Sequence, residues 1–391
     1  MIISAVPDHI TLSFKDFIKH FFNLFTFKKY EIYEQNHDFI RIYGYSCRTL
    51  FELCMMYYTS INENTITATG LQHTSFKNII NKYIDEANLD VFNYSNNIRQ
   101  VEQQTIKSNL VLITHLFGQD LDLSFLEEAK NNNNNMVIIE DRVQGGSLNQ
   151  IFSHNIIDIS IYSMRMDKRP NSLGGGFINI RNIEKNKLLI NYLIAKTRTL
   201  QKETRIERFC NLFKKIPTFF IYNYNLFTYP LIYGISILNH FNKKINTGLI
   251  TNNYRQINPG FSHDNYMKQP SYPLLKSIKE NIDNHLKIEG IQAVKNNKYM
   301  SMLSNTIKNN YYPWYSGNNL LTNYNTIYMT SNKINNFVNI CNEKNVCMIK
   351  NPTYKSLSKK HDILCNNLIY LPSLNTLNDK EMNYLVKILD N

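Results

Sequence analysis

Lys168 is the residue of this chain whose surroundings most suggest chemistry. It lies in the stretch SMRMDKRPNSLGGGF (163–177), and three consecutive glycines, Gly174 to Gly176, follow it closely. A lysine in such a place can be a solvated charge, a phosphate ligand or a nucleophile. A Walker loop requires the lysine after its glycines and a serine or threonine beside it, and the GxGxxG dinucleotide pattern is absent. The order of the residues therefore argues against nucleotide hydrolysis.

Two further features form a set with Lys168 that suits pyridoxal phosphate. This cofactor needs a lysine that binds it covalently, a carboxylate that keeps its ring nitrogen protonated, and a phosphate cup at a helix N-terminus. Asp141 ends the apolar run MVIIED, and SCRT (46–49) opens a helical pattern. Taken singly, a loop lysine is most often a solvated charge and a strand-end aspartate a helix cap. Only their combination favours the cofactor.

The same residues resemble the DegT/StrS-type sugar aminotransferases, a family of pyridoxal-phosphate enzymes with the aspartate aminotransferase fold. VIIEDRVQ (137–144) is similar to the family's VIEDxAQ, and DISIYSMRMDKRPNSLGGG (158–176) is similar, without a gap, to DIGxFSFxxxKxLxxGxGG. The cofactor contacts that this resemblance implies are Asp141 for the ring nitrogen, Gln144 for the phenolic oxygen, Ser163 for the phosphate and Lys168 as the Schiff-base lysine and catalytic residue.

The helix start SCRTL (46–50) occupies the place of the family's SGTAAL or SGRSAL. The resemblance therefore implies that Cys47, Arg48 and Thr49 form the phosphate cup. Cys47 departs from the family pattern, which has a glycine at this position. Since glycine lets the backbone approach an anion closely, the cysteine weakens the assignment of the cup.

Other segments extend the resemblance over about residues 40–391. THLFG (114–118) is similar to the family's HLFG strand end, and IYLPSLNTLNDKEMNYLVKIL to its C-terminal LPLHPxLSEEEIxxVIxxL. DNYMKQPSYPLLKSI resembles NYRMSELQAALGLAQL, whose asparagine reaches the partner subunit's cofactor phosphate, and this implies the same contact for Asn265. We expect His73 to stack on the cofactor ring, with Gln72 as the alternative.

The activity that the resemblance implies is transfer of an amino group from an amino acid, L-glutamate in this family, to the keto group of a nucleotide-linked sugar. It also implies a homodimer with shared active sites. Two alternatives stay open: a pyridoxal-phosphate sugar dehydratase or related enzyme, and a non-catalytic, membrane-associated homologue. Dehydratases of the family carry histidine in place of the lysine, so Lys168 favours the transferase.

Composition excludes several other classes of protein. An apolar fraction of 43% and a charged fraction of 19% over 391 residues are typical of a globular protein. The net charge of +12 comes from scattered basic residues, and no nucleic-acid-binding motif accompanies it. The six cysteines form no CxxC pair, and no HExxH or HxxxH pattern predicts a metal site. Without a secretory signal, we expect free thiols and a cytoplasmic location.

Short apolar runs alternate with helical patterns along the first two thirds of the chain, which predicts an α/β fold with a largely parallel sheet. Ligands bind at the carboxyl ends of such strands, where His115, Glu140, Asp141 and the Lys168 loop fall. The resemblance implies a three-layer sandwich with a mostly parallel seven-stranded sheet (fold type I) and a smaller α+β C-terminal domain. Strands are expected at 109–118, 136–141, 158–164 and 175–180, and helices at 45–61 and 75–84.

Three parts of the chain are expected as domains: an N-terminal arm at 1–39, a large cofactor-binding domain at 40–270 and a small domain at 271–391. The large domain contains an aromatic, apolar insertion at about 216–241, interrupted by prolines and asparagines. These interruptions disfavour a membrane-spanning helix. Two short helices are expected instead, packed on a partner subunit or in peripheral contact with a membrane.

Overall fold

The computed structural model describes residues 13–94, 100–102, 104–116, 120–144, 150–165, 168, 171–223, 225–242 and 266–283, and short pieces between 312 and 390. The chain divides into two compact units. One, which we call the sheet unit, consists of Thr11–Lys214 and Gly260–Lys287, and the second unit consists of Met1–Ile10, Lys215–Pro259 and Ile288–Asn391.

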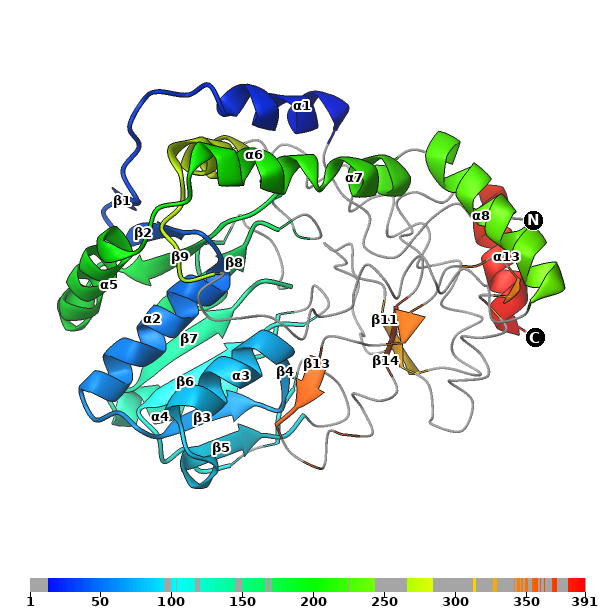
Figure 1. The fold of residues 1–391 in the computed structure, drawn as a ribbon. Coiled ribbons are helices and arrows are strands. Elements are labelled where there is room, and N and C mark those ends of the chain that lie inside the picture. Colours follow the sequence, from blue (N-terminus) through cyan, green and yellow to red (C-terminus); the bar gives the residue numbers. More distant parts are fainter. Residues whose placement is uncertain are drawn as a thin grey trace. The chain divides into compact units, whose positions relative to one another are not determined.

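The described part of the sheet unit is built on one eight-stranded sheet in the order β1-β2-β9-β8-β7-β6-β3-β5 (Figure 1). Strands β8, β7, β6, β3 and β5 are parallel to one another, whereas β9 is antiparallel to both β8 and β2. The strands are β1 (Tyr33–Gln35), β2 (Phe39–Gly44), β3 (Ile66–Thr69), β5 (Leu89–Phe92), β6 (Leu110–Thr114), β7 (Val137–Asp141), β8 (Ile159–Ser163) and β9 (Gly176–Arg181); the short β4 (Leu71–His73) lies outside this sheet.

The predicted α/β class with a mostly parallel sheet is confirmed. The expected strands at 109–118, 136–141, 158–164 and 175–180 correspond to β6, β7, β8 and β9. Every residue of β6 and β8 is buried, as expected for strands covered on both faces. The sheet has one strand more than the seven expected, because β1 pairs with β2 at its edge.

Helices cover both faces of the sheet. On one face, the Leu50 side chain of α2 (Cys47–Ser60) lies over Gly44. On the other face, the helix at 272–283 packs Leu274 and Ile278 against the aromatic side chains of the central strands, including Tyr162. The other described α-helices of this unit are α1 (Phe14–Asn23), α3 (Thr74–Tyr83), α4 (Ser124–Asn132), α5 (Lys187–Thr199) and α6 (Arg205–Phe213).

Two segments outside the predicted large domain contribute to the sheet unit. The helix at 272–283 lies beyond the expected boundary at 270, yet it belongs to the core of this unit because its apolar face fills the space over Phe177. The Asn23 amide of α1, from the expected arm, donates hydrogen bonds to Ser277 and Glu280 at 3.1 Å. The boundaries of independent domains stay a prediction.

In the second unit, two helices occupy the apolar segment as expected, α7 (Ile216–Asn223) and α8 (Asn225–Phe241). None of the described helices combines the length and apolar composition that crossing a membrane requires. The other described elements are α13 (Asp379–Asp390), β13 (Tyr354–Ser356) and an antiparallel sheet of β10 (Tyr312–Pro313), β11 (Thr326–Tyr328), β14 (Leu368–Tyr370) and β12 (Ile349–Lys350).

Substitution of Gly176 tests how tightly α2 is seated on the sheet. A Cβ atom at this position would lie 2.5 Å from the Cys47 amide nitrogen and 2.7 Å from the Tyr162 carbonyl oxygen. Because both are backbone atoms, we expect Gly176→Ala to lower the free energy of unfolding by about 2 kcal/mol, measured by urea denaturation. Gly234→Ala in α8, where a Cβ meets nothing within 4 Å, is the control, and equal effects of the two changes would contradict this packing.

Candidate functional site

The loop that carries Lys168 connects β8 to β9 and is closed by its own backbone. The Met164 carbonyl accepts hydrogen bonds from the Ser172 and Gly174 N–H groups at 3.0 and 3.1 Å. Gly175 turns the chain into β9 with a φ of 84°, a conformation that favours glycine. Lys168 is buried within this turn, so it is not the solvated charge that a loop lysine usually is.

The same loop is held from outside by two neighbouring helices. Arg208 of α6 donates hydrogen bonds to the Ser172 and Leu173 carbonyls at 3.0 and 3.1 Å. Asn281, in the helix at 272–283, donates to the Asn171 carbonyl at 2.7 Å. These contacts fix the position of the loop against the sheet.

Asp141 ends β7 beside the Lys168 loop. It is buried and accepts a hydrogen bond from the Val143 N–H at 2.9 Å. Burial raises the pKa of the Asp141 carboxyl to about 6, against the lowering influence of the Val143 N–H and the nearby Lys168 ammonium. The structure thus brings together the two residues whose combination the sequence indicated, and it does so in a place shielded from water.

The N-terminus of α2 meets the end of β8 and the start of β9. The Ser46 hydroxyl caps α2 by accepting the Thr49 N–H at 3.1 Å, and Ser46 pairs with Gly175 in an isolated bridge. The Ser163 hydroxyl hydrogen-bonds the Cys47 sulfur, and burial raises the pKa of the Cys47 thiol. Cys47 is the first residue of α2 and has helical backbone geometry. The close approach between the start of α2 and β9 is permitted by Gly176, which lies against the Cys47 backbone.

Two arginines gather at this helix N-terminus. Burial, together with the positive charge of Arg165, lowers the pKa of Arg48 to about 10. Both guanidinium groups, added to the positive end of the α2 dipole, make the site attractive to a doubly charged anion. Arg165 was not among the residues predicted from the sequence. Its position in the sequence could have indicated a role in the site, because Arg165 lies two residues after Ser163 and three before Lys168.

Three other residues that were predicted to contact the cofactor make hydrogen bonds within the protein: Thr49, His73 and Gln72. The Thr49 hydroxyl donates to the Tyr266 carbonyl. The His73 Nδ1 caps α3 by accepting the Ser75 N–H at 3.2 Å, and the alternative, Gln72, is fully buried with its amide on Thr69. Asn265 lies outside the described residues.

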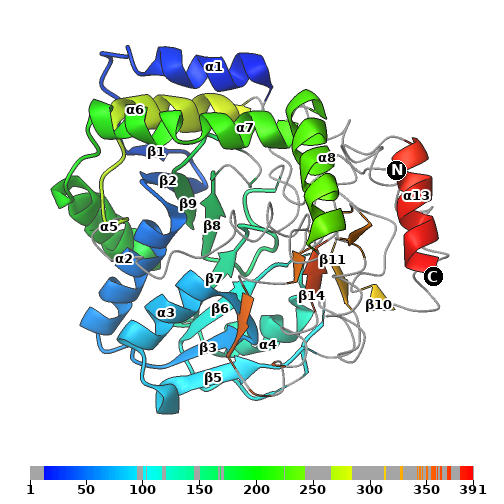
Figure 2. The same ribbon diagram turned by 45° about the vertical axis from the view of Figure 1, so that its right-hand side comes forward.

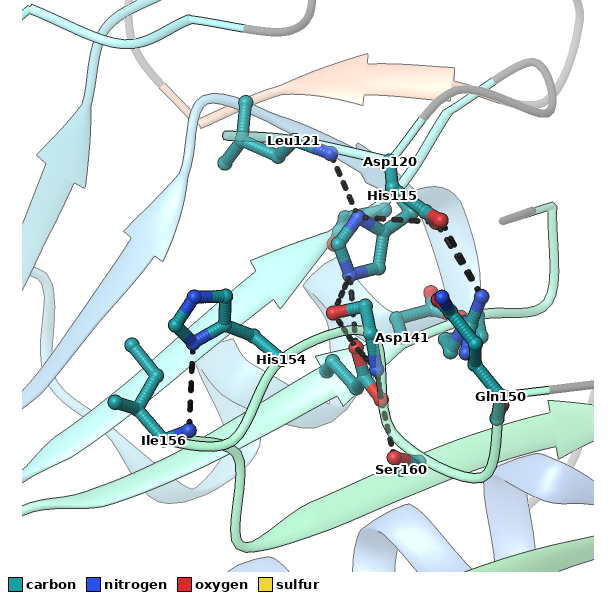
Figure 3. Close-up of polar contacts among 12 residues, drawn as sticks. His115, Asp120, Leu121, Asp141, Gln150, His154, Ile156 and Ser160 are labelled. Atoms are coloured by element: carbon teal, nitrogen blue, oxygen red, sulfur yellow. Dashed lines mark hydrogen bonds and ion pairs between the residues drawn. The ribbon is translucent and has the colours of Figure 1, made fainter. Parts of the chain in front are cut away.

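A buried polar network supports β7 next to the site (Figure 3). The His115 Nδ1 accepts the Leu121 N–H at 2.9 Å, so its Nε2–H donates to Glu140, also at 2.9 Å. Burial raises the pKa of Glu140, but the hydrogen bonds from His115 and Ser153 and the positive charge of Arg142 together outweigh this effect, so the pKa is lowered. Both ring nitrogens of His115 are thus engaged in structural hydrogen bonds, so His115 is not a candidate acid or base of the site.

Gln144 offers the clearest sign of a missing partner. Its side chain is buried, and its Oε1 atom has no hydrogen-bond partner in the described part of the chain. Buried polar atoms are nearly always satisfied, so this one indicates a place for a ligand. Among the described residues, no group of His, Cys, Asp or Glu side chains is arranged to hold a metal ion. The ligand class that fits the buried acid, lysine, amide and positive cup is therefore an organic anion with a basic ring.

Comparison with known proteins establishes the fold. No protein-family model matches this chain, and no curated protein sequence matches it. Among solved structures, the Helicobacter pylori aminotransferase PseC, involved in the biosynthesis of pseudoaminic acid, has a TM-score of 0.62 at 9% identity, over 99% of this chain and 98% of its own.

Two further solved structures span this whole chain. NtdA from Bacillus subtilis, with bound cofactor PMP, has a TM-score of 0.61 at 11% identity and is covered over 85% of its length. A putative sugar aminotransferase from Streptococcus pneumoniae, in its PMP form, has a TM-score of 0.60 at 11% identity and is covered over 98%. The chain therefore has the fold of these proteins, which confirms the predicted architecture of pyridoxal-phosphate transferases.

The raised pKa of Asp141 predicts a measurable pH dependence of stability. The protonated, buried carboxyl stabilises the folded chain fully below pH 4, and this contribution is lost as the pH rises through about 6. Asp141→Asn removes the buried charge and retains an acceptor for Val143. Relative to wild type, its free energy of unfolding should increase by about 2–3 kcal/mol between pH 4 and pH 7.5. Urea denaturation of cofactor-free protein at both pH values measures this, with Asp90→Asn at an exposed position of β5 as the control.

Proposed function

We propose that this protein is a pyridoxal-phosphate-dependent aminotransferase that moves an amino group from L-glutamate to the keto group of a nucleotide-linked sugar. The observation that carries the proposal is the burial of Asp141 beside Lys168 at the carboxyl ends of β7 and β8. A buried carboxylate can keep a ring nitrogen protonated, and a lysine amine can bind the cofactor aldehyde. The solved structures that share the fold include a putative sugar aminotransferase, which supports the choice of reaction.

Residues of the site fit both the ring and the phosphate of pyridoxal phosphate. The unsatisfied Gln144 Oε1 would accept a hydrogen bond from the phenolic hydroxyl of the ring. The N-terminal N–H groups of α2, Ser163 and the guanidinium groups of Arg48 and Arg165 would bind the phosphate. Cys47 does not interfere, because its raised pKa keeps the thiol neutral beside an anion. The departure at Cys47 is thus compatible with the cup.

Pyridoxal phosphate, when bound, supplies an electron sink that acidifies the α-carbon of an amino acid. Asp141 would hold the proton on the ring nitrogen, an ionised carboxylate being favoured there once a cation faces it. An amino donor would replace Lys168 on the cofactor. The free Lys168 amine would then take the proton from the α-carbon of the donor and return it to the cofactor carbon that carried the aldehyde. Burial excludes water from both groups, which protects this proton transfer from exchange with solvent.

The acceptor and the assembly belong to the same proposal. A nucleotide-linked sugar carries a diphosphate, for which the basic chain, with a net charge of +12, is suited. A homodimer with shared sites would complete the cup through Asn265 of the second subunit, and a cytoplasmic location would keep the thiols reduced. Retention of lysine at 168 favours transfer over the dehydratase alternative.

Substitution of Lys168 tests the cofactor assignment. Wild-type protein mixed with pyridoxal phosphate should develop the visible absorbance band of a lysine-bound cofactor. Addition of L-glutamate should remove this band, and a nucleotide-linked keto sugar should restore it. Lys168→Ala and the charge-preserving Lys168→Arg should both lack the band, because neither side chain can form the covalent bond.

Two outcomes would contradict the proposal. A band retained by both variants would show that another lysine binds the cofactor. A wild-type protein that does not bind pyridoxal phosphate would favour the non-catalytic homologue.

Substitution of Arg48 tests the phosphate cup separately from the lysine. Arg48→Gln should weaken pyridoxal phosphate binding about tenfold or more, since a charge-assisted hydrogen bond is lost. It should leave binding of pyridoxal, which lacks the phosphate, unchanged. Absorbance titration with both compounds measures the ratio of the two affinities. Arg198→Gln, at an exposed position in α5, is the matched control, and a parallel loss for both compounds would indicate a merely structural role for Arg48.

A further inference from the structure

Helix α1, the segment that follows it and helix α6 expose large apolar side chains that the proposed reaction does not use. Phe22, Phe25 and Phe27 are exposed by 69%, 72% and 76%, and Ile206 of α6 by 76%. Exposed apolar clusters of this kind mark interaction sites more often than scattered single residues do. We call the following residues the aromatic–basic face: Phe22, Phe25, Phe27, Ile206, Phe209 and Phe213, with the exposed Lys15, Lys28, Lys29, Arg205 and Lys214.

The two helices form one continuous surface. They lie side by side in both views of the sheet unit (Figures 1 and 2). At their junction, Arg205 donates a hydrogen bond to the Thr26 carbonyl at 2.8 Å, and its guanidinium lies 4.4 Å from the centroid of the Phe27 ring. The rings of Phe209 and Phe213 stack at 6.0 Å one turn further along α6. The exposed ring of Phe27 therefore lies against the start of α6, and the exposed rings of Phe209 and Phe213 follow on the same helix.

The inner sides of both helices are anchored, so the outer side chains cannot turn inward. Phe17 of α1 is buried, and Asn23 is tied to the helix at 272–283 through Ser277. Arg208 of α6 is buried on the carbonyls of the Lys168 loop, and Leu212 is fully buried next to it. The aromatic–basic face is thus presented on fixed helices.

The positive charge of the aromatic–basic face favours an anionic partner. Five basic residues belong to this face, whereas α1 and α6 contain one acidic residue each, Asp16 and Glu207, and Glu207 pairs with Lys268 at 2.8 Å. The exposed lysines and arginines are thus in excess over acidic groups. Aromatic side chains among lysines suit the boundary between acyl chains and anionic headgroups. A second copy of the chain would instead oppose like charges across the contact.

We propose that the aromatic–basic face docks this protein onto a membrane surface that contains anionic phospholipid. The exposed rings enter the headgroup region, while the lysines and arginines bind the phosphates of the lipids. This contact is separate from the one considered for the segment 216–241, and it does not depend on the proposed activity.

Vesicle co-sedimentation of the full-length protein tests this docking. The protein should bind vesicles of two parts phosphatidylcholine and one part phosphatidylglycerol, and binding should fall as salt is added and on pure phosphatidylcholine. Phe22→Ser with Phe209→Ser, and Lys28→Gln with Lys29→Gln, should each weaken binding about tenfold or more. The matched controls are Leu188→Ser, an equally exposed apolar residue of α5, and Lys107→Gln, and both should bind as wild type does.

Three outcomes would overturn the proposal. One is failure of the wild-type protein to bind anionic vesicles. Another is binding that is lost with Leu238→Ser in α8 but retained with Phe22→Ser and Phe209→Ser, which would move the contact to 216–241. The third is a lower self-association constant of the phenylalanine variant in sedimentation equilibrium without any change in vesicle binding, which would make the face a contact between copies. Thermal unfolding by circular dichroism confirms that each variant is folded.

Discussion

Burial of the Asp141 carboxyl beside the Lys168 amine is the constraint on which the rest of the site depends. Desolvation raises the pKa of Asp141 to about 6, so an ionised Asp141 without a facing cation is unfavourable at neutral pH. Hydrogen-bonded polar groups support β7, the strand that carries Asp141, and the His115–Glu140 pair is the foremost of them. A cationic ring opposite Asp141 would favour its ionised form, so the site is organised for a ligand at the expense of stability.

Close backbone approach positions the groups around this pair. Gly176 lets the first amide of α2 lie against β9, and Gly175 turns the loop that carries Lys168. As a result, a helix N-terminus, Ser163 and two arginines meet at one point, although they come from distant parts of the chain. The Ser46 cap fixes the orientation of that helix end. An anion bound there would rest on rigid backbone and not on flexible side chains alone.

The anchoring of α6 connects two functional aspects of the molecule. Its inner side holds the Lys168 loop through Arg208, whereas its outer side belongs to the aromatic–basic face. The helix follows its amphipathic pattern, with a capping box from Thr204 to Glu207 that secures its first turn. A single short helix thus supports the candidate site and presents the surface that we propose for membrane docking.

The sequence by itself determined the α/β class and the central strands, because strand periodicity is a local property. The set of Asp141, Gln144, Ser163 and Lys168 was a prediction that rested on a resemblance of local motifs. The sequence could not show that Arg165 joins Arg48, that His73 is used as a helix cap, or that the helix at 272–283 completes the core of the sheet unit. These are contacts between segments far apart in the chain. Which partner a polar or apolar side chain finds, and how deeply it is buried, is decided only when the sheet and its helices are assembled.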